Sequence, residues 1–154
     1  MNRTSLVSLA LVTVLACSSF AATPASALAC GARIDDASIR EALPSLLRTE
    51  GIPATATPPL AMVRPAELDG DPNTAEALVD LVQGELCGPA LVCPTLVIVS
   101  RGGELRSVGS GRALVVLQSS RAGYRDLGDQ SPSLIPFMPV VTRVLQWSGA
   151  RYSP

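Results

Sequence analysis

The sequence contains no histidine and no lysine, so all 12 of its basic residues are arginine. Without either residue, a serine nucleophile lacks the side chains that ordinarily activate it. The absence of histidine also removes a principal zinc ligand. Aromatic residues make up 3% of the chain and the net charge is −1, so little is available for stacking on bases or contacting phosphates. Serine hydrolysis, zinc binding and nucleic-acid binding are therefore disfavoured.

Residues 1–29 have the order of a secretory signal peptide. Arg3 gives a short positive region, residues 6–16 are apolar and uncharged, and residues 21–29 are mostly small with one proline. The apolar stretch is too short for a membrane span. Two small-x-small steps precede residue 30 and favour cleavage that releases the protein. We expect a periplasmic or secreted protein with a single domain at residues 30–154, which is long enough to bury its own core.

A second interpretation of the leader is lipidation. The four residues ending at Cys17 resemble a bacterial lipobox, in which this cysteine would be acylated and would anchor the protein in the envelope. Residues 18–28 would then form a tether of small side chains. Release remains the favoured interpretation, because a proline-containing segment of small residues follows Cys17. Contact with the membrane is expected only if the protein is lipidated.

Three cysteines remain after cleavage, and two of them are close in the sequence. Cys87 and Cys93 are separated by five residues that include Gly88 and Pro89, which favour a turn. This spacing fits neither the two-residue redox motif nor the usual zinc knuckle. In an oxidising compartment it predicts a structural disulfide between Cys87 and Cys93. Cys30 is left unpaired, removed with the leader, or lipidated.

The first regular element of the expected domain is a helix. Asp35 or Asp36 can cap it, and Gly51 can end it in a left-handed conformation. Pro44 lies inside the pattern and predicts either a kink or a helix that begins there. The apolar residues at helical spacing are Ile39, Leu43, Leu46 and Leu47.

The rest of the chain favours strands. Residues 52–65 contain four prolines and are expected to be extended, whereas residues 75–83 fit either a short helix or a strand. Later β-rich runs are separated by glycine-containing turns, as in hairpins. These runs are residues 95–100, 104–108, 112–118, 124–127 and 140–147. The sequence predicts an α+β fold with an N-terminal helix packed on an antiparallel β-meander.

An acidic segment offers the best candidate for metal chemistry. Its oxygen-bearing side chains are Asp69, Asp71 and Asn73, followed by Glu76 and preceded by Glu67. Their alternation is typical of calcium loops, but the bend glycine is missing and Pro72 interrupts the run. Asp and Gly also favour turns for backbone reasons alone. We expect a structural turn with at most weak calcium affinity, and no other cofactor.

Several short motifs occur in a characteristic order. They lie at residues 68–71, 76–79, 87–93, 123–127 and 147–152. In this order the chain resembles a loosely defined group of small exported proteobacterial domains of unassigned function. The resemblance implies a small β-rich periplasmic domain and carries no activity with it. The chain departs from the pattern in the five residues between its cysteines and in its lengthened acidic turn.

These observations lead to one favoured function and two alternatives. The favoured one is an exported, non-catalytic accessory domain that binds an envelope protein, a glycan or a small ligand. One alternative is an envelope enzyme that uses carboxylates, such as Asp126 with Asp129 or Glu104. The other is a structural lipoprotein anchored through Cys17. An enzyme needs convergent carboxylates in a concave site, whereas a binding module needs an exposed sheet face or loop.

Overall fold

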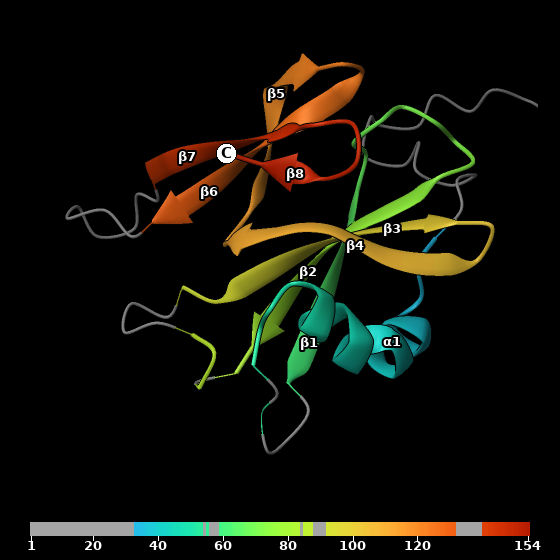
Figure 1. Ribbon diagram of the computed structural model, residues 1–154, viewed down its shortest axis with the longest axis vertical. Helices are drawn as coiled ribbons and strands as arrows, with labels where there is room; N and C mark the ends of the chain where they lie inside the picture. Colours follow the sequence, from blue (N-terminus) through green and yellow to red (C-terminus); the bar gives the residue numbers. More distant parts are fainter. Residues whose placement is uncertain (1–32, 54, 56–58, 84, 88–91, 132–139) are drawn as a thin grey trace, which may run out of the picture.

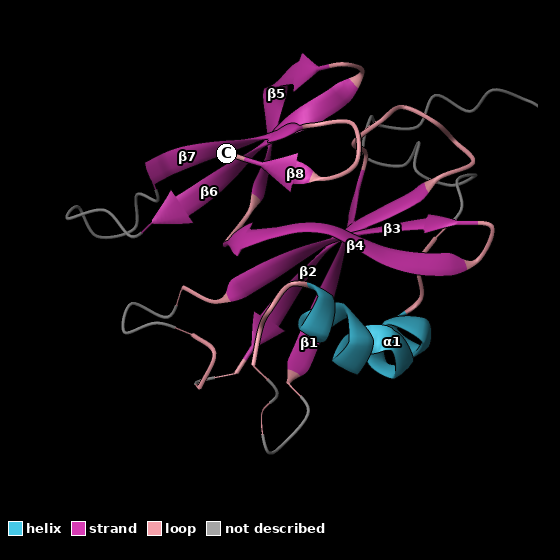
Figure 2. Ribbon diagram, in the orientation of Figure 1, coloured by secondary structure: helices cyan, strands magenta, loops and turns pink. Residues whose placement is uncertain are grey.

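The computed structural model describes residues 33–53, 55, 59–83, 85–87, 92–131 and 140–154. Within these ranges it shows one helix followed by antiparallel strands (Figures 1 and 2). The elements are α1 (Asp36–Thr49), β1 (Leu60–Ala66), β2 (Ala75–Val82), β3 (Pro94–Arg101), β4 (Glu104–Arg112), β5 (Val115–Arg121), β6 (Tyr124–Ser131), β7 (Val140–Trp147) and β8 (Tyr152–Ser153). The fold is therefore β-rich α+β. The strands form two four-stranded sheets, β1-β2-β3-β4 and β5-β6-β7-β8, where the sequence predicted one meander.

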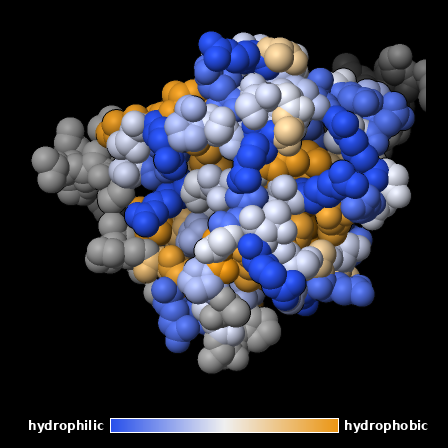
Figure 3. Space-filling view, in the orientation of Figure 1, coloured by the Kyte–Doolittle hydropathy of each residue, from blue (hydrophilic) through white to orange (hydrophobic). Residues whose placement is uncertain are grey.

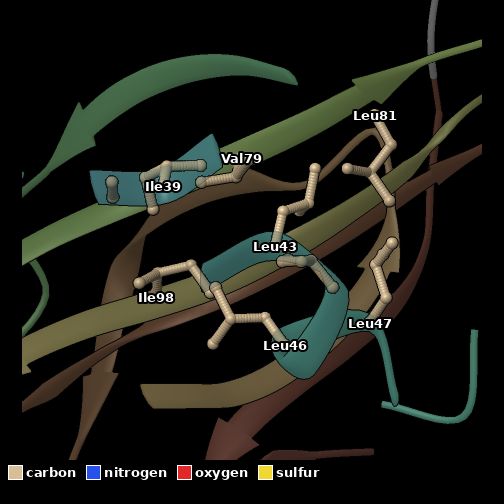
Figure 4. Packing of buried hydrophobic residues seen from close by; sticks show 9 residues of the cluster. Ile39, Leu43, Leu46, Leu47, Val79, Leu81 and Ile98 are labelled. Carbon is tan, nitrogen blue, oxygen red and sulfur yellow. The ribbon is translucent and has the colours of Figure 1, made fainter. Parts of the chain in front are cut away.

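Local signals in the sequence define the helix. The carboxylate of Asp35 caps α1 by accepting the backbone N–H of Ser38 at 2.8 Å. Pro44 lies inside the helix, which continues to Thr49, and Gly51 follows with a φ of +67°. Its apolar face is buried against the first sheet (Figure 4). The residues that form this contact are Ile39, Leu43, Leu46 and Leu47 from α1, and Ala77, Val79, Leu81, Leu96 and Ile98 from the strands.

The first sheet is covered on both faces. Val79 and Ile98 face the helix, whereas their neighbours Leu78 and Val97 belong to a second core shared with the other sheet. Strand β2 is consequently buried on both faces, which removes the alternation of buried and exposed residues that identifies a half-buried strand. This explains why residues 75–83 fitted either a helix or a strand.

The second core lies between the sheets. Figure 1 shows α1 at one end of the molecule, the second sheet at the other, and the first sheet between them. The buried residues of this core are Leu68, Leu78, Val97, Val108, Leu114, Leu127, Leu145 and Tyr152. Among the described residues no helix covers the outer face of the second sheet, which is the face turned away from this core.

The chain passes from one sheet to the other at Ala113. This residue has a φ of +45° and separates β4 from β5. A positive φ is uncommon for alanine, and the sequence placed the break earlier, at the glycines of residues 109–111, which lie within β4. The expected strand at residues 112–118 is accordingly divided: Arg112 ends β4, and β5 begins at Val115.

The predicted disulfide is confirmed. Cys87 and Cys93 are bonded with their Cα atoms 4.1 Å apart. Cys87 follows β2, and Cys93 directly precedes β3, so the bridge joins the ends of two paired strands. The expected signal peptide, the lipidation site Cys17, Cys30 and the residues at 88–91 and 132–139 lie outside the described residues. The single helix within the described part of the chain is neither long nor apolar enough to cross a membrane.

Candidate functional site

The acidic segment between β1 and β2 divides into two parts in the structure. In the exposed part, Asp71 accepts the backbone N–H of Asn73 at 2.9 Å and its side-chain amide at 3.0 Å. These hydrogen bonds hold the pKa of the Asp71 carboxyl below its usual range. Asp69 in turn accepts the N–H of Asp71 at 2.8 Å, next to Gly70 with a φ of +73°. This part is a turn whose polar side chains satisfy the local backbone.

The other part is a group of three carboxylates. Glu67, Asp69 and Glu76 each place one carboxylate oxygen within 4.8 Å of the other two, and we call this group the acidic corner. Of the predicted calcium ligands, Asp69 and Glu76 thus lie together. Asp71 and Asn73 are instead hydrogen-bonded to each other in the exposed turn. Glu67 joins the group because Ala66 and Glu76 are paired across the hairpin.

Glu76 is the buried member of the acidic corner, with a fractional exposure of 7%. Its Oε2 accepts the backbone N–H groups of Leu68 and Asp69. Its Oε1 is buried and has no hydrogen-bond partner among the described residues. Burial raises the pKa of Glu76 to about 7; the two N–H groups oppose this shift, and the nearby charges of Asp69 and Glu67 add to it.

Arg101 connects the acidic corner to a group of aromatic rings. Its guanidinium lies 3.5 Å from Oδ2 of Asp69 and donates a hydrogen bond of 2.9 Å to the hydroxyl of Tyr124. Tyr124 stacks on Trp147 with ring centroids 4.3 Å apart. Trp147 meets Tyr152 edge to face at 5.4 Å. A change at Asp69 can therefore reach the aromatic rings through one side chain.

Backbone hydrogen bonds hold the same corner against the second sheet. The N–H of Arg125 donates to the carbonyl oxygen of Leu68 at 2.8 Å. The hydroxyl of Tyr152 donates to the carbonyl oxygen of Arg125 at 2.9 Å, and burial raises the pKa of this hydroxyl. The loop that carries the acidic corner thus forms part of the junction between the sheets.

The carboxylates considered for catalysis are mostly held in ion pairs. Asp129 pairs with Arg143 and accepts the backbone N–H of Arg112. Glu104 is exposed and pairs with Arg106. Asp126 is buried, and its Oδ1 has no hydrogen-bond partner in the described part of the chain. Asp129 and Glu104 are therefore engaged in structural contacts.

Strand β7 carries three exposed valines, of which the adjacent Val140 and Val141 point to opposite faces of the sheet. Val140, Val141 and Val144 are 50%, 39% and 39% exposed, and we call them the valine strip. One edge of β7 pairs with β6. Within the described residues the other edge pairs only with β8, at Gln146 and Trp147. Figure 3 shows apolar atoms at the surface over this end of the second sheet.

Two of these valines, Val141 and Val144, lie on the outer face of the second sheet. Gly128 lies on that face, because its neighbour Leu127 points into the core. The methyl groups of Val141, Leu117 and Val115 lie 2.9, 3.1 and 3.2 Å from the position that a Cβ on Gly128 would take. Any side chain at Gly128 would push these groups apart.

Comparison of the chain with protein-family models, curated proteins and solved structures found no match. Its function must therefore be argued from its own residues. The sequence brought Glu67, Asp69 and Glu76 together as candidates, but which of the acidic residues converge depends on the hairpin register. The valine strip depends on a strand edge that, among the described residues, pairs only with β8.

Proposed function

We propose that this chain is an exported, non-catalytic binding domain that takes an extended segment of another envelope protein along β7. The observation that carries the proposal is the valine strip beside a strand edge that β8 covers only at its end. Unpaired backbone groups on a strand edge are a template for another strand, and pockets or apolar side chains nearby give the pairing selectivity.

A second exposed apolar group lies on β1 and β2, but its edge is less suited to pairing. Leu60, Met62 and Val82 are exposed there, and β1 is the edge strand of the first sheet. Pro65 lies within β1 and has no N–H to donate, as is common in protected edge strands. Strand β7 contains no proline and carries β-branched residues that fit a pleated surface.

The non-catalytic part of the proposal is supported by the composition. The chain has no histidine or lysine to act as a base, and Asp129 and Glu104 are engaged by arginines. The character of residues 1–29 supports export. The resemblance to small exported proteobacterial domains agrees with an accessory role, and membership of that group is part of this proposal.

The test is retention of periplasmic proteins on the immobilised domain. The variant carries Val141→Arg and Val144→Arg, which place charge on the valine strip. Its matched control is Ser119→Arg, at an exposed position of β5 in the same sheet. We expect one or more proteins to be retained by the wild type and the control and lost by the variant, with unchanged melting temperatures. Equal retention by all three, or retention of glycan alone, would contradict the proposal.

A further inference from the structure

We propose that the acidic corner is a calcium site formed by Glu67, Asp69 and Glu76. Each residue offers one carboxylate oxygen within 4.8 Å of the other two. Oxygens that share one Ca²⁺ at about 2.3–2.6 Å lie no more than about 5 Å apart, so these separations are compatible with a shared ion. The inference concerns a surface separate from the valine strip and does not depend on the proposed function.

A buried oxygen of Glu76 that lacks a hydrogen-bond partner also supports a cation at this site. Glu76 is 93% buried, and its Oε1 accepts no hydrogen bond from the described residues. Buried carboxylate oxygens without a partner are rare because desolvation is costly. Arg101 approaches Asp69 at 3.5 Å from the same group, but it does not satisfy this oxygen. A cation bound on the Oε1 side of Glu76 would do so.

The donor set selects the kind of cation. All three ligands are carboxylates, and the chain contains no histidine, so the site suits a hard cation that prefers oxygen. Ca²⁺ accepts irregular arrangements of oxygen ligands, whereas Mg²⁺ demands a near-octahedral one. Glu67 is exposed and Glu76 is buried, so the ion would lie at the surface with room for water to complete its coordination.

The contacts of Asp69 provide a built-in reporter. Asp69 shares Arg101 with Tyr124, and Tyr124 stacks on Trp147, the only tryptophan of the chain. An ion on Asp69 competes with the arginine for the same carboxylate. We therefore expect calcium to change the fluorescence of Trp147 as it binds.

The experiment is a calcium titration of the disulfide-bonded domain at pH 7.5. Calorimetry and the fluorescence of Trp147 monitor the binding. Melting curves in calcium and in EDTA accompany it. The variant is Glu67→Gln, because Glu67 is exposed and its loss should leave the fold intact. The control is Asp71→Asn, in the same acidic segment but outside the acidic corner. We expect calcium to raise the melting temperature by several degrees, with affinity falling at least tenfold in Glu67→Gln and less than twofold in Asp71→Asn.

Three outcomes would overturn the inference. The first is that millimolar calcium produces no heat of binding and no change in melting temperature. Another is an equal loss of affinity in Asp71→Asn and Glu67→Gln, which would place the ion on the alternating turn residues. The third is an equal response to Mg²⁺, which would exclude selection of calcium. Partner retention through the valine strip is measured separately, so either proposal can fail alone.

Discussion

Glu50 forms a salt bridge of 2.9 Å with Arg151, which lies 101 residues further along the chain. The Glu50 side chain is 1% exposed and also accepts the hydroxyls of Ser107 and Ser110, each at 2.8 Å. One carboxylate thus joins the end of α1 to β4 and to the last turn of the protein.

Replacing Glu50 should destabilise the fold. Glu50→Ala removes the acceptor of three donors and leaves two serine hydroxyls in a partly buried place, so we expect a loss of about 2–4 kcal/mol in the free energy of unfolding. Glu41→Ala, at an exposed position of α1, is the control and should change it by less than about 0.5 kcal/mol. Urea denaturation measures both. A loss no larger than that of the control would show that this network contributes nothing.

The free energy of unfolding should depend on pH through the ionisation of Glu76. Its pKa is 4.5 in a model peptide and about 7 in the folded protein, so the folded state holds the proton more tightly. The stability that this group contributes is therefore complete below about pH 4.5 and is lost as pH rises to 7. The full loss is about 3 kcal/mol. Glu76→Gln should lack this fall and Glu41→Gln should retain it, measured by urea denaturation in EDTA. If the free energy of unfolding of Glu76→Gln and of the wild type depended on pH in the same way, Glu76 would not be the source of the fall.

The disulfide should stabilise the domain without affecting any chemistry. Cys87→Ser is expected to lower the free energy of unfolding by about 2–3 kcal/mol, because a short loop loses its constraint in the unfolded chain. The reduced wild type should fall to the same value, while dithiothreitol should leave the variant unchanged. Free thiols at both positions in protein purified without reductant would contradict the bond.

The close approach of β4 to β8 should make Gly109 intolerant of substitution. A Cβ added there would lie 2.9 Å from Cβ of Tyr152 and 3.4 Å from its carbonyl oxygen. Gly109→Ala should therefore cost about 1–3 kcal/mol through overpacking. Ser119→Ala on exposed β5 is the control. Unfolding by heat distinguishes them, and equal melting temperatures would mean that β8 moves aside freely.

The sequence predicted those parts of the fold that local chemistry determines. The cap at Asp35, the apolar spacing of α1 and the glycine after it are all contained within 17 residues. The hairpin turns at Gly102–Gly103 and Ala122–Gly123 were also visible, because each contains glycine, which adopts a positive φ readily. The Cys87–Cys93 pair followed from its short spacing, the intervening glycine and proline, and the expectation of an oxidising compartment.

The remaining features depend on contacts that no short window contains. The division into two sheets occurs at Ala113, whose conformation its residue type does not favour. Strand β2 is buried on both faces only because the second sheet packs on it. Strand β7 keeps a free edge beyond Gln146 only in relation to its partners β6 and β8, as far as the described residues show. Each of these results from tertiary packing that overrides the local pattern.

The strand order has a consequence for how the chain folds. In both sheets each strand pairs with its neighbour in sequence, so most pairings close short loops, and such topologies fold faster than those with distant pairings. Helix α1 and β1 to β4 are complete before the ribosome has made β5. Until then the Leu78 and Val97 face is open to water, and a chain stalled near Ala113 would present that face to chaperones or to other nascent chains.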